Sequence, residues 1–242
     1  MAKNLSGLPN QDGVPDTDMD AYKQDYEAHR AGISTEECIK YYNRTAEKYE
    51  QTFNPDRYQG YVMAADMVKK YTKDDKSIKI LDIGAGTGLL GEQLKNRDFT
   101  DVDGLEPSSE MLKIATEKGV YQQYYCDTLD GKNVKIPDDR YDVVVSSGAM
   151  GEGHIPCNGL CEMIRIVKQG GLAIIVMKEG YLELVMEYKD RLEPFMEELE
   201  KSGQWKQLER TVVSNYSFGQ NGLIFVYKVL QSGFKPIISK FI

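Results

Sequence analysis

Short apolar runs alternate with amphipathic segments over much of the chain, from about residue 77 to residue 201. The apolar runs are rich in branched and aromatic residues and predict β-strands, whereas the segments between them have the spacing of amphipathic helices. The expected strands are 77–83, 101–105, 121–126, 141–146 and 172–177. The expected helices are 89–96, 109–118, 160–167 and 181–201, with only a poor helix and a loop after 126. Strands that alternate with helices in this way form a mostly parallel sheet with helices on both faces.

The chain before and after this alternation has a different pattern. Residues 1–20 are rich in glycine, proline and polar residues, and we expect a flexible tail there. Two strand-like runs near the C-terminus flank a Gly-Gln-Asn-Gly sequence at 219–222, which predicts an antiparallel hairpin. The pattern as a whole predicts an α/β fold in one domain of residues 21–242, with a doubly wound, mostly parallel seven-stranded sheet, N-terminal helices and the C-terminal hairpin. The N-terminal helices are expected at 20–30, 35–53 (capped by Ser34 or Thr35) and 58–71, and the hairpin strands at 208–216 and 223–230.

Composition limits the class of protein and its partners. With 242 residues, of which 41% are hydrophobic, the chain can bury one sizeable core. Its formal net charge of −8 argues against a broad nucleic-acid surface or an anionic membrane, because both need a basic face. The 4 cysteines are scattered and only 2 histidines are available, so we expect reduced thiols and neither a disulfide framework nor a zinc site. No apolar run suits a signal peptide or a membrane span, and we expect a cytoplasmic monomer.

A glycine-rich run follows the first expected strand. Residues 82–88 read Asp-Ile-Gly-Ala-Gly-Thr-Gly, with glycines at alternate positions. Glycines at this spacing let a strand turn sharply into a helix, so that a ligand can lie against bare backbone near the N–H groups of the helix start. The run therefore predicts a site for a nucleotide-like cofactor.

Two registers of this loop are open. Gly86, Gly88 and Gly91 match the dinucleotide pattern G-x-G-x-x-G, but the strand would then have to extend through Gly84 and Ala85. A short-chain oxidoreductase would also need a Tyr-x-x-x-Lys pair, and none of the 16 tyrosines has a lysine four residues later. We favour the register that starts at Gly84 and keep an NAD-type oxidoreductase as the alternative.

In the favoured register Asp82 lies two residues before the first glycine, and the run resembles motif I of the class I S-adenosylmethionine (SAM) methyltransferases. Residues 168–171, Lys-Gln-Gly-Gly, resemble the Lys-Pro-Gly-Gly signature of the same class, with Gln in place of Pro. Residues 42–50 resemble the Tyr-Asp-x-x-Ala-x-x-Tyr-Asp element of many members that act on small molecules, with Asn and Glu in its acidic positions. Residues 148–158 are similar to a Gly-Ala-x-x-x-Gly-x-x-Pro-Cys-Asn segment of the Williams-Beuren syndrome critical-region methyltransferase-like family.

The resemblance extends from about residue 42 to residue 171. It implies a Rossmann-like class I enzyme that uses SAM to methylate an acceptor, and we expect that acceptor to be a small molecule. The Asn/Asp-Pro-Pro-aromatic motif of many amide and nucleobase N-methyltransferases is absent from the end of the fourth strand, and residues 54–56 lie too far upstream to replace it. A SAM-binding module without catalysis is a second alternative, because no residue stands out as a base.

Ligands in open α/β sheets bind beyond the carboxyl ends of the strands, so each strand end has a candidate role. Glu106 lies 18 residues beyond Gly88, where a carboxylate can accept both ribose hydroxyls; the alternative is a favourable interaction with a helix N-terminus. Asp103 is a weaker candidate for the same task. Asp127 can accept the adenine amino group while the N–H of Thr128 reaches the ring edge, and the alternative for Asp127 is an ordinary helix N-cap.

Small residues around Ser146 leave room for the methionine part of SAM and its sulfonium. The family pattern places Tyr42 and Tyr49 over the cofactor, the alternative being packing of a helix face. His154 is a weak candidate for a base, because a loop histidine is usually solvated, and Cys157 is interpreted as a small buried thiol rather than a nucleophile. The expected cofactor-binding residues are Asp82, Gly84, Ala85, Gly86, Gly88, Glu106, Pro107, Met111, Asp127, Thr128, Ser146, Tyr42 and Tyr49.

Overall fold

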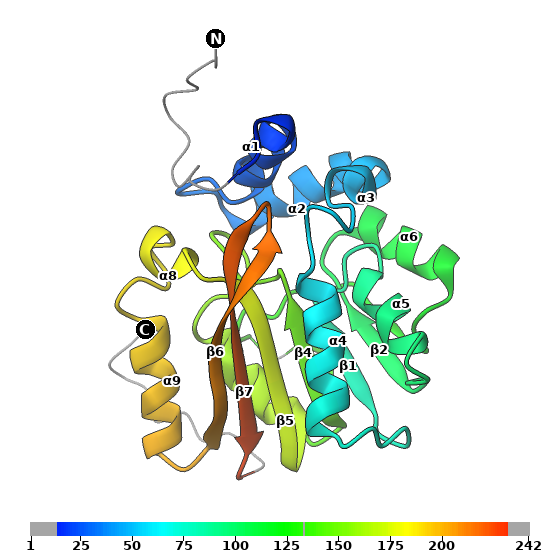
Figure 1. Ribbon diagram of the computed structural model, residues 1–242. Helices are drawn as coiled ribbons and strands as arrows, with labels where there is room; N and C mark the ends of the chain where they lie inside the picture. The colour runs from blue at the N-terminus through cyan, green and yellow to red at the C-terminus, as the bar shows by residue number, and fades with distance from the viewer. Residues whose placement is uncertain (1–13, 133, 232–242) are drawn as a thin grey trace.

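The computed structural model describes residues 14–132 and 134–231, and its centre is a seven-stranded sheet (Figure 1). The strands are β1 (Ile80–Ile83), β2 (Val102–Leu105), β3 (Tyr124–Tyr125), β4 (Tyr141–Ser147), β5 (Val167–Lys178), β6 (Trp205–Ser217) and β7 (Gln220–Val229). Their order is β3-β2-β1-β4-β5-β7-β6. Strands β1 to β5 are parallel, whereas β7 runs antiparallel to both of its neighbours. This arrangement confirms the predicted doubly wound sheet and its C-terminal hairpin.

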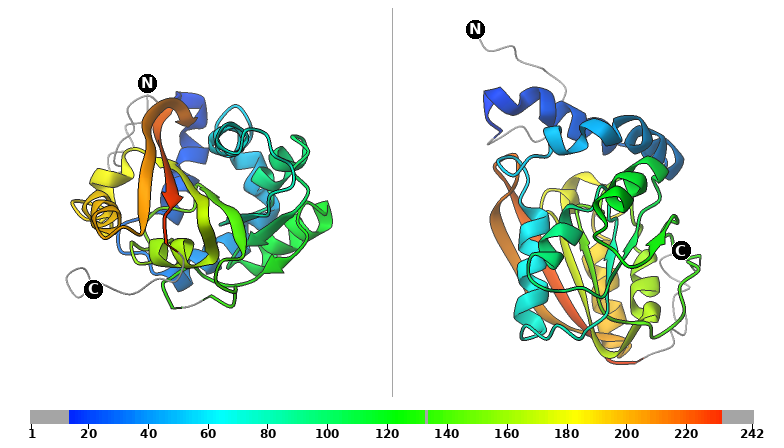
Figure 2. Two further views of the ribbon diagram at one scale, coloured as in Figure 1. Left: turned by 90° about the horizontal axis from the view of Figure 1, so that it is seen from below. Right: turned by 90° about the vertical axis from the view of Figure 1, so that its right-hand side faces the viewer.

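Helices cover both faces of the sheet, and an N-terminal group lies across the end at which the parallel strands finish (Figure 1, Figure 2). The 3₁₀ helices are η1 (Asp16–Asp18) and η2 (Ala46–Lys48). The α-helices are α1 (Met19–Ala28), α2 (Thr35–Thr45), α3 (Tyr49–Thr52), α4 (Gly60–Tyr71), α5 (Leu89–Lys95), α6 (Ser109–Lys118), α7 (Gly159–Ile166), α8 (Tyr181–Leu184) and α9 (Leu192–Lys201). Within the described ranges, no helix combines the length and the apolar character that crossing a membrane requires.

The core consists of two apolar layers, one on each face of the sheet. Successive residues of a strand point to opposite faces, so Val144 of β4 packs with α7 and α9 while Val143 and Val145 pack with α4 and α5. Because both faces of the central strands are buried, their sequences are nearly continuous apolar runs rather than alternations. This burial on both faces explains why the parallel strands are recognisable in the sequence as short apolar runs.

The N-terminal segment is helical, and its second helix is shorter than expected. Residues 1–13 of the expected tail lie outside the described residues, and the first α-helix begins at Met19. Ser34 caps α2 in a complete capping box with Glu37, which agrees with the predicted cap. The expected helix 35–53 is divided by the 3₁₀ turn η2, so that α2 and α3 follow one another with a change of direction.

The expected long helix 181–201 is wrong, because two helices and an irregular link occupy this segment. The backbone of Val185 is extended, with φ −92° and ψ 117°, and Asp190 has a positive φ of 55°. Tyr188 lies between them with a buried side chain, and its hydroxyl donates to the carbonyl of Ile155 at 2.5 Å. A tertiary contact therefore overrides the helical pattern of this segment.

Some boundaries near the sheet edges also differ from the expectation. The third strand contains only 2 residues instead of the expected 121–126, and no helix is present in the described part of the loop that follows it. Residues 168–171 lie within β5 rather than before it. The hairpin turns at Phe218 and Gly219, with positive φ of 51° and 74°, so the rest of the expected turn sequence belongs to β7.

Candidate active site

A cavity of about 100 Å³ lies at the carboxyl ends of β1, β2 and β4, where α2 forms one of its walls. The structure brings together many of the residues that the sequence singles out, although they come from separate parts of the chain. Those that line the cavity are Tyr42, Tyr49, Gly84, Gly86, Glu106, Pro107, Met111, Asp127, Thr128 and His154. Four others, Asp82, Ala85, Gly88 and Ser146, are buried beside the cavity and do not line it. Ser147, Gly148 and Ala149 line it in place of Ser146.

The glycine loop forms a bare wall of this cavity. Gly84 and Gly86 have positive φ of 74° and 53°. A Cβ on Gly84 would lie 2.2 Å from the Cβ of Ala149, so only glycine lets the loop after β1 approach the loop after β4. A Cβ on Gly86 would meet nothing nearer than the Gly84 carbonyl oxygen at 4.0 Å, which means that it would project into open space. The loop therefore presents backbone alone to a ligand.

Glu106, the first residue after β2, is buried against this loop. Its Oε2 accepts the N–H of Gly86 at 3.0 Å, and its Oε1 accepts the N–H of Ser108 at 2.8 Å. Burial raises the pKa of Glu106 to about 7, against the opposing effect of these two hydrogen bonds. Each carboxylate oxygen has further lone pairs, so Glu106 can still accept two hydroxyl protons from a ligand.

Asp127 and Thr128 follow β3 and also line the cavity. The Oδ1 of Asp127 accepts the N–H of Thr128 at 2.8 Å, so the two groups that the sequence assigns to adenine bond to each other. The Oδ2 of Asp127 remains as an acceptor for an amino group. Asp127 does not act as a helix N-cap, because no helix begins next to it in the described residues and the next one is α7.

Asp82 supports the glycine loop from behind. Its Oδ2 accepts the hydroxyl of Tyr121 at 2.5 Å, and burial raises the pKa of Asp82 to about 7. The ring of Tyr121 lies against Gly91 and Gly104, where a Cβ would approach it to 2.7 Å and 2.8 Å. This packing accounts for Gly91, the residue that completes the dinucleotide-like pattern.

Residues 35–53, which contain α2, η2 and α3 and which we call the lid, form one wall of the cavity. The hydroxyl of Tyr42 reaches His154 in the loop after β4, and the ring of Tyr42 meets that of Tyr49 edge to face, with centroids 6.3 Å apart. Both tyrosines line the cavity, as the family pattern implies. Their contact with a cofactor stays a prediction.

Asn43 and Glu50 also tie the lid to the rest of the domain. The Oδ1 of Asn43 accepts the hydroxyl of Ser108 at 2.8 Å and the N–H of Glu110 at 3.2 Å, so the lid contributes to the N-terminal end of α6. Glu50 forms an ion pair with Lys118 at 2.6 Å. The sequence pattern suggests no role for Asn43, although this residue occupies an acidic position of the 42–50 element.

Both ring nitrogens of His154 are engaged. Its Nδ1 lies 2.7 Å from the carbonyl of Glu152, which can only accept, so Nδ1 carries the proton. Its Nε2 then accepts the hydroxyl of Tyr42 at 2.9 Å. Burial lowers the pKa of His154 to about 3. This geometry favours a role in holding Tyr42, and the assignment of a base to His154 stays a prediction.

The cysteines have the character of thiols rather than thiolates. Cys157 is buried, its Sγ donates to the carbonyl of Glu187 at 3.2 Å, and burial raises its pKa to about 12. Cys38 lines the cavity and its pKa is raised to about 12 by the same cause. Cys126 is exposed. Within the part of the chain that the structure describes, no group of three or more His, Cys, Asp or Glu side chains is placed to hold a metal ion.

A buried polar cluster lies beside the cavity, and the sequence analysis did not predict it. Asp25 and His29 of α1 meet Lys178 at the end of β5, with 3.2 Å between the Oδ2 of Asp25 and the Nζ of Lys178. The Nδ1 of His29 lies 3.4 Å from the Oδ1 of Asp25. The pair Asp25 and Lys178 is separated by 153 residues, so no local spacing reveals it.

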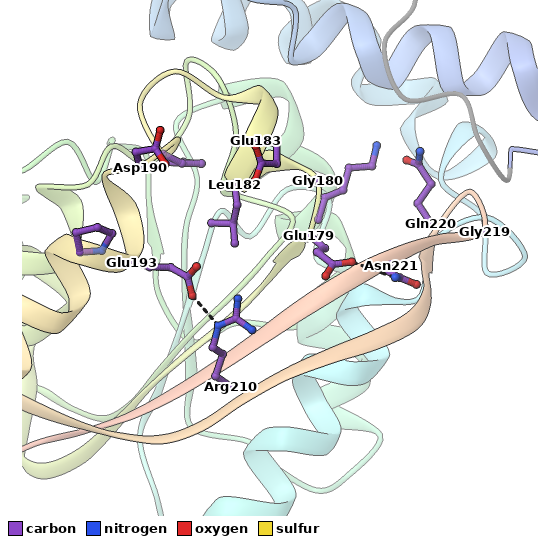
Figure 3. Close-up of a pocket in the computed structure, with 13 residues that line it drawn as sticks. Glu179, Gly180, Leu182, Glu183, Asp190, Glu193, Arg210, Gly219, Gln220 and Asn221 are labelled. Atoms are coloured by element: carbon purple, nitrogen blue, oxygen red, sulfur yellow. Dashed lines mark hydrogen bonds and ion pairs between the residues drawn. The ribbon is translucent and has the colours of Figure 1, made fainter.

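A larger cavity, of about 690 Å³, lies between the ends of β5, α8, α9 and the β6–β7 turn (Figure 3). Its polar side chains largely pair with one another: Glu193 bonds to Arg210 at 2.6 Å, and Glu179 accepts from the side chain of Asn221 at 3.0 Å (Figure 3). None of the glycine-loop residues lines it, so we place the cofactor chemistry in the smaller cavity.

Comparisons with known proteins find similarity in the part of the chain that contains the glycine loop. Residues 80–171 match the family described as "Methyltransferase domain". Human methyltransferase-like protein 27 is 30% identical over 171 residues, which cover 70% of this chain and 69% of that protein. A demethylmenaquinone methyltransferase of Chlorobaculum tepidum is 34% identical over 117 residues, and the match spans only 48% of this chain and 47% of the relative.

Solved structures share the fold at low identity. The 1,6-didemethyltoxoflavin-N1-methyltransferase of Burkholderia thailandensis, with 1,6-didemethyltoxoflavin and S-adenosylhomocysteine bound, has a TM-score of 0.59 and 14% identity, covering 80% of this chain and 87% of its own. The [4+2]-cyclase SpnF has a TM-score of 0.62 and 14% identity, covering 84% and 99%. One fold thus carries different named activities, and the site must decide the function.

Proposed function

The chain belongs to the class I SAM-dependent methyltransferases, and from this premise we propose that it transfers the methyl group of SAM to a small-molecule acceptor. SAM is the cofactor of this class, and the family assignment replaces the NAD-type alternative. The proposal rests on one observation above the others: the bare glycine wall and the buried Glu106 share one cavity at the strand ends.

The residues of the cavity fit SAM. The Cβ that Gly86 lacks would project into open space, so a flat ligand can lie directly on the backbone of the loop. Glu106 would hold the ribose hydroxyls, Asp127 the adenine amino group, and Leu129 of the same loop offers a buried apolar surface to the ring. Ser147 and Gly148 leave room beyond the glycine loop for the methionine part.

When bound, SAM supplies a methyl group on a sulfonium, which is a built-in leaving group. The remaining work belongs to the chain. Tyr42 and Tyr49 would cover the reacting centre and exclude water, while His154 fixes the hydroxyl of Tyr42. Asn43 holds the lid on α6 beside Glu106, so closure of the lid and orientation of the cofactor are mechanically linked.

Two features support a small acceptor. The cavity of about 100 Å³ is below the 300–1,000 Å³ that is usual for ligand pockets, so the lid has to move even for a small molecule to enter. A lid that must close over the reacting centre is difficult to combine with a macromolecular acceptor. Several curated relatives are named for small acceptors, among them a 2-methyl-6-phytyl-1,4-hydroquinone methyltransferase of rice, which is 25% identical over 141 residues.

The test combines binding with turnover. Calorimetry with SAM, S-adenosylhomocysteine and NAD should give binding of the first two and none of NAD. A methyl-transfer assay over a panel of metabolites, with protein and RNA substrates included, should find turnover among the small molecules. Turnover of a protein or RNA alone would refute the small acceptor, and SAM binding without turnover of any substrate class would favour a SAM-binding module without catalysis. The predicted cytoplasmic location and monomeric state need separate measurement.

A further inference from the structure

A second cavity, which we call the aromatic cavity, adjoins the cofactor cavity, and tyrosine and phenylalanine side chains form much of its wall. Its volume is about 30 Å³, and Tyr42, Tyr49 and Gly148 line both cavities. Gly148 follows β4, at the strand ends where we expect the methyl group of the cofactor, so the second cavity is next to the expected reacting centre. Its six aromatic side chains are Tyr42, Tyr49, Phe53, Tyr58, Tyr181 and Tyr216.

Besides Ser217 and the tyrosine hydroxyls, the polar groups of this aromatic cavity are the buried cluster of Asp25, His29 and Lys178. The Nζ of Lys178 lies 3.2 Å from the Oδ2 of Asp25 and 5.5 Å from the centre of the Tyr181 ring. Asp25 and Lys178 are 9% and 7% exposed, so each charge depends on the other. Burying two charged groups costs folding free energy, so we expect this pair to have a function.

Burial lowers the pKa of His29, against the opposing effect of Asp25, and the hydrogen bonding of the ring leaves one of its nitrogens as an acceptor. Its Nδ1 donates to the carbonyl of Asp25 at 2.8 Å, and its Nε2 is therefore left as an acceptor. The carboxylate of Asp25 lies 3.4 Å from the same Nδ1 and would stabilise the charge that a second proton creates. The charged and titratable groups that face His29 are Asp25 on α1, Lys178 on β5, His154 in the loop after β4 and Tyr181 on α8.

We propose that the aromatic cavity is the acceptor subsite, that it takes the hydroxyl of an aromatic ring, and that Nε2 of His29 is the base that deprotonates it. The inference rests on the proposed function, since it names the acceptor class for the same methyl transfer. In the reaction, the acceptor O–H bond breaks and its proton goes to Nε2 of His29. The oxygen forms the new bond to the methyl carbon, and the electron pair of the former sulfur–carbon bond stays on sulfur.

The charge of the cluster selects the acceptor. A protonated amine would place a second buried cation beside Lys178, with Asp25 as the single carboxylate for both. A phenol instead becomes an anion next to Lys178 as its proton reaches His29, so both new charges have a partner. Aromatic walls favour a flat ring by edge and face contacts.

The ring of the acceptor must displace aromatic contacts of the lid. A space of about 30 Å³ admits a hydroxyl but no ring. Phe53 of the lid meets Tyr58 edge to face with ring centroids 6.3 Å apart, and His29 meets Tyr181 at 5.2 Å. Lifting residues 35–53 would separate Phe53 from Tyr58 and leave Asp25, His29 and Lys178 together, and the acceptor ring would enter the space that Phe53 leaves.

The test uses 4-nitrophenol, because its ionised form absorbs at longer wavelength and reports the loss of the proton without turnover. With the protein saturated by S-adenosylhomocysteine, at a pH below the pKa of the free phenol, binding should raise the ionised fraction of the bound probe about tenfold, a shift of about one pKa unit. The variants His29→Gln and Lys178→Met should each abolish this rise, while 4-nitroaniline should bind more weakly than 4-nitrophenol. Glu193→Gln in the larger cavity is the matched control and should leave the rise unchanged.

The outcomes separate this inference from the proposed function. If the wild-type protein does not bind S-adenosylhomocysteine, the methyltransferase function itself is refuted. Normal cofactor binding with no change in the ionised fraction of 4-nitrophenol, or with the full rise in both cluster variants, would overturn the acceptor subsite alone. A rise that disappears in Glu193→Gln would move the acceptor to the larger cavity. If a cluster variant fails to bind S-adenosylhomocysteine and is misfolded, the wild-type measurement still decides.

Discussion

Binding of SAM should release a proton from Glu106 below neutral pH. The carboxyl is buried between the N–H groups of Gly86 and Ser108, and burial raises its pKa to about 7. Only the ionised carboxylate can accept hydrogen bonds from ribose hydroxyls at both of its oxygens. A bound cofactor therefore stabilises the carboxylate and lowers its pKa. Unlike most surface carboxyls, Glu106 therefore has to lose its proton in the pH range in which the enzyme is measured.

The magnitude follows from that pKa. With a pKa of about 7, about one molecule in eleven carries an ionised Glu106 at pH 6 and about ten in eleven at pH 8. The affinity for SAM should therefore increase about tenfold from pH 6 to pH 8, which corresponds to about 1.4 kcal/mol. The stability of the free protein changes in the opposite direction: the raised pKa favours folding fully below the ordinary value of 4.5, and this contribution is lost as the pH rises through about 7.

The assay is titration calorimetry in two buffers of different ionisation enthalpy, which counts the protons released on binding. The amino group of SAM also titrates near neutral pH, so the quantity of interest is the difference between the wild type and Glu106→Gln. Asp82→Asn is the matched control, because burial raises the pKa of Asp82 to about 7 as well but Asp82 bonds to Tyr121 outside the cavity. The control should keep the proton release that Glu106→Gln loses.

Two results would refute this reasoning. Equal proton release in the wild type and in Glu106→Gln would mean that Glu106 is ionised before SAM arrives. Full SAM affinity in Glu106→Gln, together with an altered stability, would show that Glu106 serves only the loop and the start of α6.

Three other predictions concern single features of the site. In Gly86→Val the branched side chain enters the cavity from a residue with φ 53°, and SAM affinity should fall at least tenfold, about 1.4 kcal/mol; unchanged affinity in a folded variant would remove the loop from the site. Hydrogen exchange across 35–53 should slow when S-adenosylhomocysteine binds, because the ligand would add contacts to those that Tyr42 and Asn43 already make; equal protection in both states would make the lid a fixed element. A thiol reagent should modify the exposed Cys126 long before the buried Cys157, whose pKa is raised to about 12, and mass spectrometry that finds early modification of Cys157 would restore it as a candidate nucleophile.

The sequence was sufficient to predict that the candidate cofactor residues lie together, because its signals are local. The glycine spacing, the acid after β2 and the acid after β3 each follow directly from a predicted strand, and the strand-end rule places them together. The structure adds that Asp82 and Ser146 lie behind the cavity and that Ser147 lines it instead. A shift of one residue along a strand reverses the face to which a side chain points, which no spacing argument resolves.

The proposed acceptor subsite could not be predicted because it depends on contacts between distant segments. His29 and Asp25 read from the sequence as ordinary polar positions of an amphipathic helix, and only the fold places them against Lys178. The split of the segment 181–201 has the same origin, since Tyr188 leaves the helix to bond with the loop that contains Ile155. Local pattern is a weak guide wherever a buried polar group finds its partner across the chain.

The packing of Tyr121 constrains how this sequence can vary in evolution. Its ring occupies the space of two missing side chains, at Gly91 and Gly104, and its hydroxyl is bonded to Asp82. A smaller residue at 121 would open a cavity beneath the cofactor loop and leave a buried carboxyl without its donor, whereas a larger residue at 91 or 104 has no room while the ring is present. These four positions should therefore covary among relatives: lineages that lose the tyrosine are expected to gain side chains at both glycines and to replace the aspartate.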